Sequence, residues 1–131
     1  MIISDAFGYI NMMDRTADAS YLRETVIANN IANVDTPTYK RQDVEFSSIL
    51  KDKLSHYTAE ERSLDKAVNK LSVEDTEARK YVDYPNYSYR LDRNNVDIDT
   101  ENVELASEQQ RYSTITTSIT NDFQRFNAVI S

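Results

Sequence analysis

Residues that form tight turns are nearly missing from this sequence. Glycine occurs once, at Gly8, and proline twice, at Pro37 and Pro85, in a chain of 131 residues. Sandwiches and barrels need many tight turns, for which glycine and proline are the usual residues. Long helices joined by few connections need far fewer of them. The sequence therefore predicts a mainly α fold.

Composition narrows the range of functions. Apolar residues make up 40% of the chain, below the roughly 45–50% of ordinary globular domains, so a large enzyme-like core is not expected. The net charge is −7, and the basic residues are interleaved with acids, which argues against nucleic acid as a partner. The chain has no cysteine, which excludes disulfides and thiolate metal sites. The expected partner is protein.

Neither a membrane span nor a cleavable signal peptide is expected. No stretch approaches the roughly 20 apolar residues that cross a bilayer. The first residues, MIISDAFGYI, lack the basic region of a signal peptide and are interrupted by Asp5.

The N-terminal third carries the period of a helix. Apolar and small residues recur at spacings of three, four or their sums, at Ile3, Phe7, Ile10, Ala17, Tyr21, Ala28 and Ile31. This pattern predicts a helix over residues 4–33. Ser4 suits the N-cap, and Pro37 keeps Thr36 out of helical geometry.

The C-terminal segment carries a heptad pattern. Spacings of four and three alternate along a seam of Leu105, Gln109, Tyr112, Thr116, Ile119, Phe123, Phe126 and Ile130. Such a seam is typical of a coiled coil, and Asp97 or Asp99 can cap the helix. We expect the two terminal helices to pair as a coiled-coil-like hairpin, with residues 1–50 and 96–131 as a helical core domain.

Residues 51–95 are dense in charge and tyrosine and predict a flexible or partly ordered insert. A short helix is expected at about 44–55, and short strands around Tyr81 and around Tyr87–Leu91. The tyrosines at 81, 84, 87 and 89 suit either an interface patch or local packing of a hairpin onto the helices.

No residue is assigned a catalytic, cofactor-binding or metal-binding role. His56 is the single histidine and has no nucleophile or ligand at a suitable spacing, so we interpret it as a surface residue. A lone glycine excludes a glycine-rich phosphate loop. A small hydrolase would have to use His56 or a pair of carboxylates, and is a remote alternative.

Asparagines concentrate where the first helix should end, in ANNIANVDTPTYKR (residues 28–41). Asn29 and Asn33 are one turn apart and lie on one helix face. Exposed, they are only mildly unfavourable helix residues. Buried in a seam between helices, an amide penalises every register in which it lacks a partner, and so selects one packing arrangement.

This segment resembles the signature A-x-N-I-A-N-x-x-T-P-G-Y-K of the bacterial flagellar axial proteins, which form the rod, the hook and the hook–filament junction. The layout of the chain resembles the proximal rod proteins of the FlgB type. We therefore interpret as an assembly motif Ala28, Asn29, Asn30, Ile31, Ala32, Asn33, Thr36, Pro37, Tyr39 and Lys40. Thr38 stands where the signature has glycine, so the turn must either avoid a positive φ or strain a β-branched residue.

The resemblance implies a structural subunit of the basal-body rod, exported from the cytoplasm through the flagellar type III apparatus without a cleaved signal peptide. Its implied partners are other rod proteins, the adaptor that joins the rod to the membrane ring, and the export gate. Phe46 and Leu50 of FSSIL have the Phe-x-x-x-apolar form that the resemblance associates with the gate, or they simply cap the helical core. The alternative function is a helical adaptor or binding module that packs against partner helices.

Overall fold

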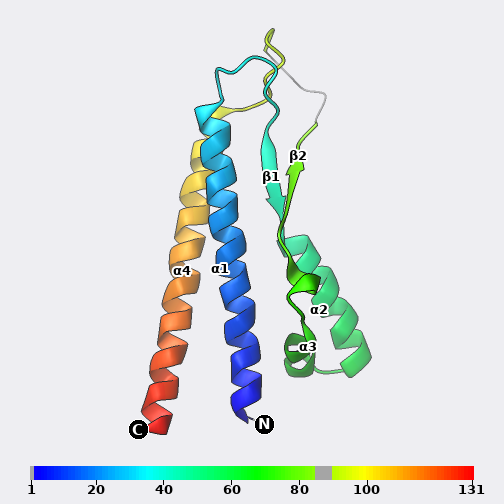
Figure 1. The fold of residues 1–131 in the computed structure, drawn as a ribbon, viewed down its shortest axis with the longest axis vertical. Coiled ribbons are helices and arrows are strands. Elements are labelled where there is room, and N and C mark those ends of the chain that lie inside the picture. Colours follow the sequence, from blue (N-terminus) through cyan, green and yellow to red (C-terminus); the bar gives the residue numbers. More distant parts are fainter. Residues whose placement is uncertain (1, 85–89) are drawn as a thin grey trace.

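Two long helices dominate the structure, a computed structural model that describes residues 2–84 and 90–131. Helix α1 spans Ile2–Ala32 and helix α4 spans Ile98–Ile130. They lie side by side and antiparallel, with both chain termini at the same end (Figure 1). The predicted mainly α hairpin is confirmed. Along neither helix does the described part of the chain contain a segment apolar enough to cross a membrane.

Helix α4 begins at a side-chain cap. The carboxylate of Asp97 accepts hydrogen bonds from the backbone N–H groups of Asp99 (3.0 Å) and Thr100 (3.3 Å). These bonds satisfy donors that have no partner inside the helix. Of the two predicted caps, Asp97 is the one used.

The middle of the chain forms an arm beside α1, which we define as residues 42–82 (Figure 1). In chain order the arm consists of β1 (Gln42–Glu45), α2 (Ser47–Glu61), α3 (Leu64–Lys70), the 3₁₀ helix η1 (Glu74–Thr76) and β2 (Arg79–Val82). The two strands pair antiparallel, with Gln42 opposite Val82 and Glu45 opposite Arg79. This pairing joins residues on either side of position 51, where we expected the insert to begin.

The arm is more regular than its charge pattern suggested. The helix expected at 44–55 is confirmed by α2, which begins at Ser47 and continues to Glu61, whereas the residues before Phe46 belong to β1. A strand near Tyr81 is confirmed by β2. Of the strand expected around Tyr87–Leu91, residues 87–89 lie outside the described residues, and the two that follow form a bend and a turn. The β1–β2 pair is non-local, so no local sequence period announces it.

Helix α3 packs on α1 at the single glycine. A Cβ atom at Gly8 would lie 2.1 Å from Oδ1 of Asn69, so a side chain there would displace the side chain of Asn69 from α1. About two turns further on, Nη1 of Arg15 donates to the carbonyl of Ser72 (2.7 Å) and to Oγ1 of Thr76 (2.9 Å). Gly8 and Arg15 thus attach the far end of the arm to α1.

The buried residues of α1 differ from the predicted apolar stripe because the helix contacts both α4 and the arm. Ile10 and Ala17 are buried as expected. Further along, Val26 and Ile27 are buried, whereas Tyr21 is exposed. A helix with neighbours on two sides buries two faces, and a single stripe does not describe it.

The face of α4 that meets α1 differs from the predicted seam. Glu101 and Glu108 are buried, whereas Gln109, Phe123 and Ile130 are exposed, so these three do not belong to the hairpin contact in the single chain. The remaining seam residues are half-buried: Leu105, Tyr112, Thr116, Ile119 and Phe126. The difference arises because a glutamate is normally predicted to lie at the surface. Glu101 and Glu108 can be buried because side chains of α1 form hydrogen bonds with their carboxylates.

Candidate functional site

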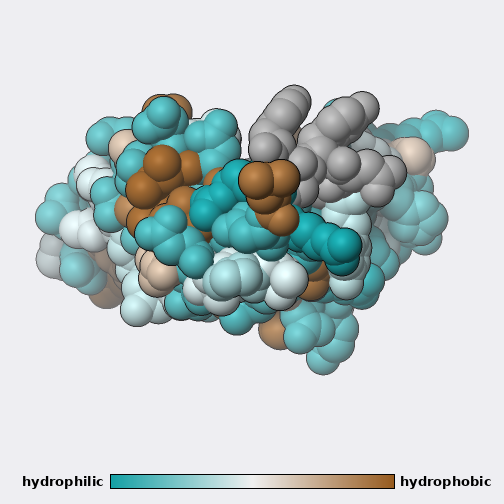
Figure 2. Space-filling model, turned by 90° about the horizontal axis from the view of Figure 1, so that it is seen from above, coloured by the Kyte–Doolittle hydropathy of each residue, from teal (hydrophilic) through white to brown (hydrophobic). Residues whose placement is uncertain are grey.

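The predicted assembly motif lies where α1 ends and the chain crosses to β1. The chain returns to the same place from β2 before it enters α4. We call this region, residues 20–45 and 94–108, the closed end of the hairpin. Seen from above, the molecule presents a mainly hydrophilic surface with separate hydrophobic patches (Figure 2).

Asn30 is the buried centre of the closed end, with none of its surface exposed. Its Nδ2 donates to the carbonyl of Gln42 (2.7 Å) and to Oε2 of Glu101 (3.0 Å). Its Oδ1 accepts from the N–H of Gln42 (3.0 Å) and from the hydroxyl of Tyr39 (3.1 Å). Both donors and both acceptor positions of the amide are therefore used.

The amide of Asn30 takes the place of a neighbouring strand. Arg41, just before β1, accepts a backbone hydrogen bond from the N–H of Asp83 (2.8 Å). Because backbone groups alternate in direction along a strand, the N–H and C=O of Gln42 point away from β2. Asn30 bonds to both groups and so covers the outer edge of β1 at this residue.

Asn94 performs a similar task at the end of α1. It has none of its surface exposed, and its Nδ2 lies within hydrogen-bond distance of the carbonyls of Asn33 (2.8 Å), Val34 (3.0 Å) and Thr36 (2.9 Å). The last carbonyls of a helix have no partner within the helix. Asn94 supplies one from the segment that leads into α4.

Asn95 fills the end of the strand pair. Its Oδ1 accepts from the N–H of Arg41 (2.7 Å), and its Nδ2 donates to the carbonyl of Asp83 (3.0 Å). The amide is thus inserted between two backbone groups that would otherwise bond to each other. No role was predicted for Asn94 or Asn95 from the sequence, although two adjacent amides shortly before a helix cap are a recognisable signal.

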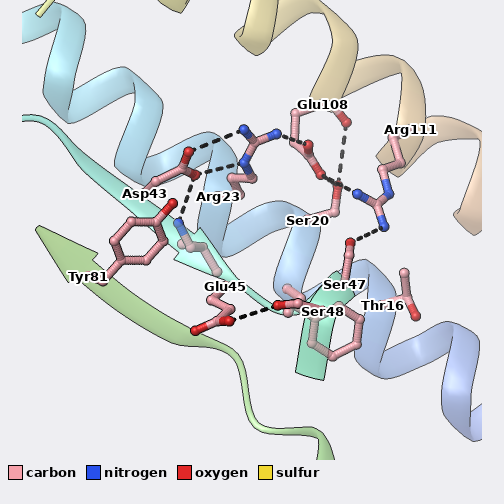
Figure 3. A pocket seen from close by; sticks show the side chains of 13 residues that line it. Thr16, Ser20, Arg23, Asp43, Glu45, Ser47, Ser48, Tyr81, Glu108 and Arg111 are labelled. Carbon is pink, nitrogen blue, oxygen red and sulfur yellow. Dashed lines mark hydrogen bonds and ion pairs between the residues drawn. The ribbon is translucent and has the colours of Figure 1, made fainter. Parts of the chain in front are cut away.

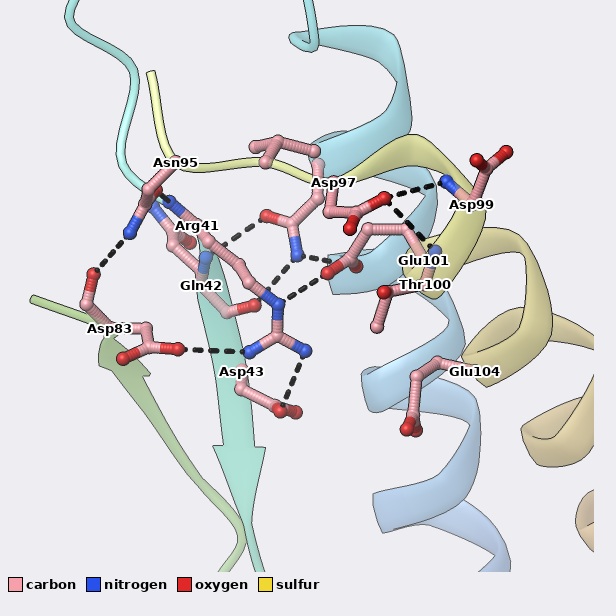
Figure 4. A network of polar contacts seen from close by, with 12 residues as sticks. Arg41, Gln42, Asp43, Asp83, Asn95, Asp97, Asp99, Thr100, Glu101 and Glu104 are labelled. Carbon is pink, nitrogen blue, oxygen red and sulfur yellow. Dashed lines mark hydrogen bonds and ion pairs between the residues drawn. The ribbon is translucent and has the colours of Figure 1, made fainter. Parts of the chain in front are cut away.

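Arg41 connects the two strands to α4 (Figure 4). Its guanidinium pairs with Glu101, with Asp43 (3.0 Å) and with Asp83 (3.3 Å). Burial alone would lower the pKa of Arg41, but the hydrogen bond and charge of Glu101 outweigh it and raise that pKa above its ordinary value. Glu101 is completely buried and accepts from both Arg41 and Asn30.

Arg23 is the matching connection from α1. It pairs with Asp43 (2.8 Å) of β1 and with Glu104 (2.9 Å) and Glu108 (2.8 Å) of α4. The hydrogen bond that Arg23 donates to Asp43 is the largest influence on the Arg23 guanidinium and raises its pKa. The hydroxyl of Ser20 donates to Glu108 Oε1 (2.6 Å).

Asp43 lies between the two arginines and belongs to both clusters. Burial by itself would raise the pKa of Asp43, but the hydrogen bond from Arg23 and the charges of both arginines lower it. The carboxylate therefore stays ionised. We define the polar clasp as Arg23, Asn30, Arg41, Asp43, Glu101 and Glu108.

A cleft of about 560 Å³ adjoins the clasp, between α1, β1 and α4 (Figure 3). Its charged groups bond to one another rather than facing an open volume. Arg111, for example, donates to Oγ of Ser47 (3.3 Å) and lies 3.9 Å from a Glu108 oxygen. Among the described residues, no group of His, Cys, Asp and Glu is arranged to hold a metal ion. The arrangement fastens three elements together.

The motif residues divide by burial. Asn30 is buried; Ile31, Asn33, Tyr39 and Lys40 are half-buried; Ala28, Asn29, Ala32, Thr36 and Pro37 are exposed. The amide of Asn33 donates to the carbonyl of Asn29 (2.8 Å) and accepts from the hydroxyl of Thr36 (3.1 Å). Both bonds are local, as in a helix stop. The buried amide that we expected at Asn29 or Asn33 is found at Asn30.

Thr38, which stands where the signature has glycine, has a positive φ. Its φ is 63°, in the left-handed region that β-branched residues rarely occupy. Its N–H donates to the carbonyl of Asp92 (2.7 Å), which ties the turn to the segment before α4. Of the two alternatives, strain is the one found.

The remaining predicted residues lie in the arm. Phe46 is buried and Leu50 is half-buried, and the N–H of Leu50 donates to the carbonyl of Phe46 (2.8 Å). His56 is exposed beside Tyr57, with ring centroids 5.5 Å apart. Of the tyrosine patch, Tyr81 and Tyr84 are exposed, and positions 87 and 89 lie outside the described residues.

Comparison with known proteins points to one group. The family model described as "Flagella basal body rod protein" matches residues 23–40, from the first arginine of the clasp to the end of the motif. "Flagellar basal body rod protein FlgB" of Borrelia hermsii is 37% identical over 128 residues, covering 92% of this chain and 94% of that protein. The protein of the same name from Bacillus subtilis is 30% identical over 125 residues, covering 95% and 94%. Its counterpart from Borreliella burgdorferi is 30% identical over 128 residues, covering 92% and 94%.

Proposed function

Because this chain belongs to the FlgB family of flagellar basal body rod proteins, it is a structural subunit of that rod, and we propose that α1 and α4 make its contacts with neighbouring subunits. The supporting observation is the opposite end of the hairpin, which we call the open end: residues 7–17 and 112–130. Large apolar side chains are exposed there: Phe7, Phe123, Val129 and Ile130. Exposed apolar groups gathered in one region are typical of a surface that is covered in an assembly.

The outer face of α4 also suits burial. From residue 102 to residue 130 its exposed positions contain no acidic residue, although the chain carries 22. The hydroxyls of Thr114, Thr117 and Thr120 each donate to a carbonyl of their own helix at 2.9 Å. Covering this face would strip water from no exposed carboxylate, and the three hydroxyls would keep their partners, which lowers the desolvation cost.

The alternative, a helical adaptor that packs against partner helices, would use the same exposed face. Self-association separates the two, because an adaptor binds its target without polymerising. We propose the rod position proximal to the cell, with other rod proteins, the adaptor to the membrane ring and the export gate as partners. We further propose export without a cleaved signal peptide and no catalytic role, in line with the structural names of the relatives.

Replacement of Phe123 by alanine tests the role of α4. Phe123 keeps 47% of its surface exposed in the single chain, so the variant should change the stability of that chain little. In a bacterium that lacks this gene, the Phe123→Ala chain should be exported but should build few rods, whereas Gln124→Ala, the exposed neighbour, should restore motility. Normal rods with Phe123→Ala would contradict the proposed contact.

We propose that Phe46 and Leu50 are read by the export gate in the unfolded chain. Residues four apart lie on one helical face and can enter a single apolar groove. Burial of Phe46 in the folded subunit is compatible with this, because the gate acts before folding. The alternative role is packing alone.

A secretion assay separates the two roles. Phe46→Ala with Leu50→Ala should lower export while cytosolic levels persist, and Val68→Ala, which removes a buried side chain elsewhere in the arm, should be exported normally. If the double variant is exported normally but fails to assemble, these two residues serve packing only.

A further inference from the structure

We propose that Asn30 is a positioning residue: its buried amide, held by Glu101 of α4, serves as the pairing partner of β1 and fixes the arm to the helical hairpin. Three elements meet at this one side chain, since Asn30 belongs to α1, Glu101 to α4 and Gln42 to β1. The inference rests on the proposed function, because a rod subunit has to present its arm and its helices at a constant angle.

The strand needs such a partner. Two-stranded sheets are marginally stable in water, and β1 pairs only with β2 within the described part of the chain. The outward N–H and C=O of Gln42 would otherwise lie unpaired against α1, and burying unpaired backbone groups is costly. Asn30 satisfies both groups from a helix whose position α4 already fixes.

The partners of Asn30 also fix its orientation. An amide rotated by half a turn would exchange its oxygen and nitrogen. The carboxylate of Glu101 accepts only from the nitrogen, and the N–H of Gln42 donates only to the oxygen. The rotated amide would therefore face Glu101 with its oxygen and would lose both bonds. Arg41 in turn holds Glu101, which connects the orientation of Asn30 to the rest of the polar clasp.

Spin labels measure the position of the arm directly. The chain has no cysteine, so His56→Cys on α2 and Ser107→Cys on α4, both at exposed positions, give one labelled pair in the purified full-length chain. The pair should show a narrow distance distribution. Asn30→Ala should broaden that distribution toward longer distances, and Asn29→Ala, the same change at the exposed neighbour, should leave it unchanged.

A loss of stability alone has to be separated from a loss of position. Val26→Ala removes buried volume from α1 outside the clasp and serves as the destabilised control. The proposal predicts that Asn30→Ala broadens the distribution under conditions where Val26→Ala, at a matched fraction of folded protein, does not. Equal broadening in both variants, or none in either, would overturn it.

A milder variant covers the case in which Asn30→Ala does not fold. Tyr39→Phe keeps the ring and removes only the hydroxyl that donates to Asn30 Oδ1. Hydrogen exchange should then show reduced protection of the Gln42 amide, by less than the roughly tenfold that complete loss of one hydrogen bond would give. Unchanged protection in Tyr39→Phe would contradict the proposed role. Because these measurements use the single chain, they can fail while rod assembly through α1 and α4 still holds.

Discussion

The two ends of the α1–α4 hairpin are held by different interactions. At the closed end, Glu101 and Asn30 are fully buried and every polar group of the amide is bonded. At the open end Phe7 stacks on Phe126, with ring centroids 5.1 Å apart, and Phe7 remains partly exposed. The closed end is complete within one chain. The open end retains apolar surface that a neighbouring subunit can cover.

From this difference we infer that the two ends of the helices have different roles. Buried ion pairs and amides tolerate few alternative partners, so they favour one arrangement of the chain at the expense of stability. Apolar contacts are non-directional, so they suit contacts that form when subunits assemble. The residues matched by the family model, 23–40, lie at the closed end.

Glu101→Ala should have the largest effect, because it removes a carboxylate that serves both Arg41 and Asn30. Breaking a buried ion pair by deleting one partner typically costs about 3–5 kcal/mol of unfolding free energy. Urea unfolding measures the loss. Asn102→Ala, at the exposed next residue, should change the free energy by less than about 0.5 kcal/mol. A similarly small effect of Glu101→Ala would mean that the polar clasp is not what holds the closed end.

Phe126→Ala should cost less, which sharpens the contrast between the ends. The ring is only half-buried and stacks on a partly exposed partner, so we expect about 1–2 kcal/mol, below the roughly 3–5 kcal/mol of a fully buried phenylalanine. Phe123→Ala, at the exposed seam position, should change stability by less than about 0.5 kcal/mol. Equal losses in the two variants would show that the open end is packed more completely than the structure indicates.

Thr38→Gly should stabilise the chain by about 1 kcal/mol, since it relieves a β-branched residue at positive φ and adds only the flexibility of glycine to the unfolded state. Thermal unfolding measures the gain. Thr36→Gly, where φ is not positive, should be destabilising. Destabilisation by Thr38→Gly would mean that the turn relies on the threonine side chain itself.

Acid should weaken the closed end before the open end. The pKa of Asp43 is lowered in the folded chain, so its contribution to stability is fully present above its unfolded pKa of about 3.9 and is lost as the pH falls through the lower folded value. Stability measured from pH 6 downward should therefore decline below about pH 4. In Asp43→Asn this part of the decline should be smaller, and an unchanged acid profile would argue against the role of Asp43.

Much of the fold follows from sequence patterns, whereas the site follows from contacts between distant segments. Helical periods predicted α1 and α4, and Asp97 carried a recognisable cap. The strand near Tyr81 was predicted and is β2, whereas β1 was not predicted, because it is four residues long and is paired with a segment far along the chain.

The buried amide was assigned to the wrong asparagine for a similar reason. Asn29, Asn30 and Asn33 are chemically alike, and helix spacing does not reveal which of them faces β1. Glu101 and Glu108 read as solvated acids until Arg41 and Arg23 are placed beside them. At Thr38, by contrast, the missing glycine was visible in the sequence, and the structure only had to decide between strain and a changed turn.

Native-state hydrogen exchange on the isolated chain tests most directly whether the two ends differ as proposed. Amides of residues 23–30 and 102–108, near the polar clasp, should exchange slowly, by openings that approach global unfolding. Amides of residues 8–14 and 118–126, near the open end, should exchange faster, by local fraying. Uniform protection along both helices, or slower exchange at the open end than at the closed end, would contradict the account.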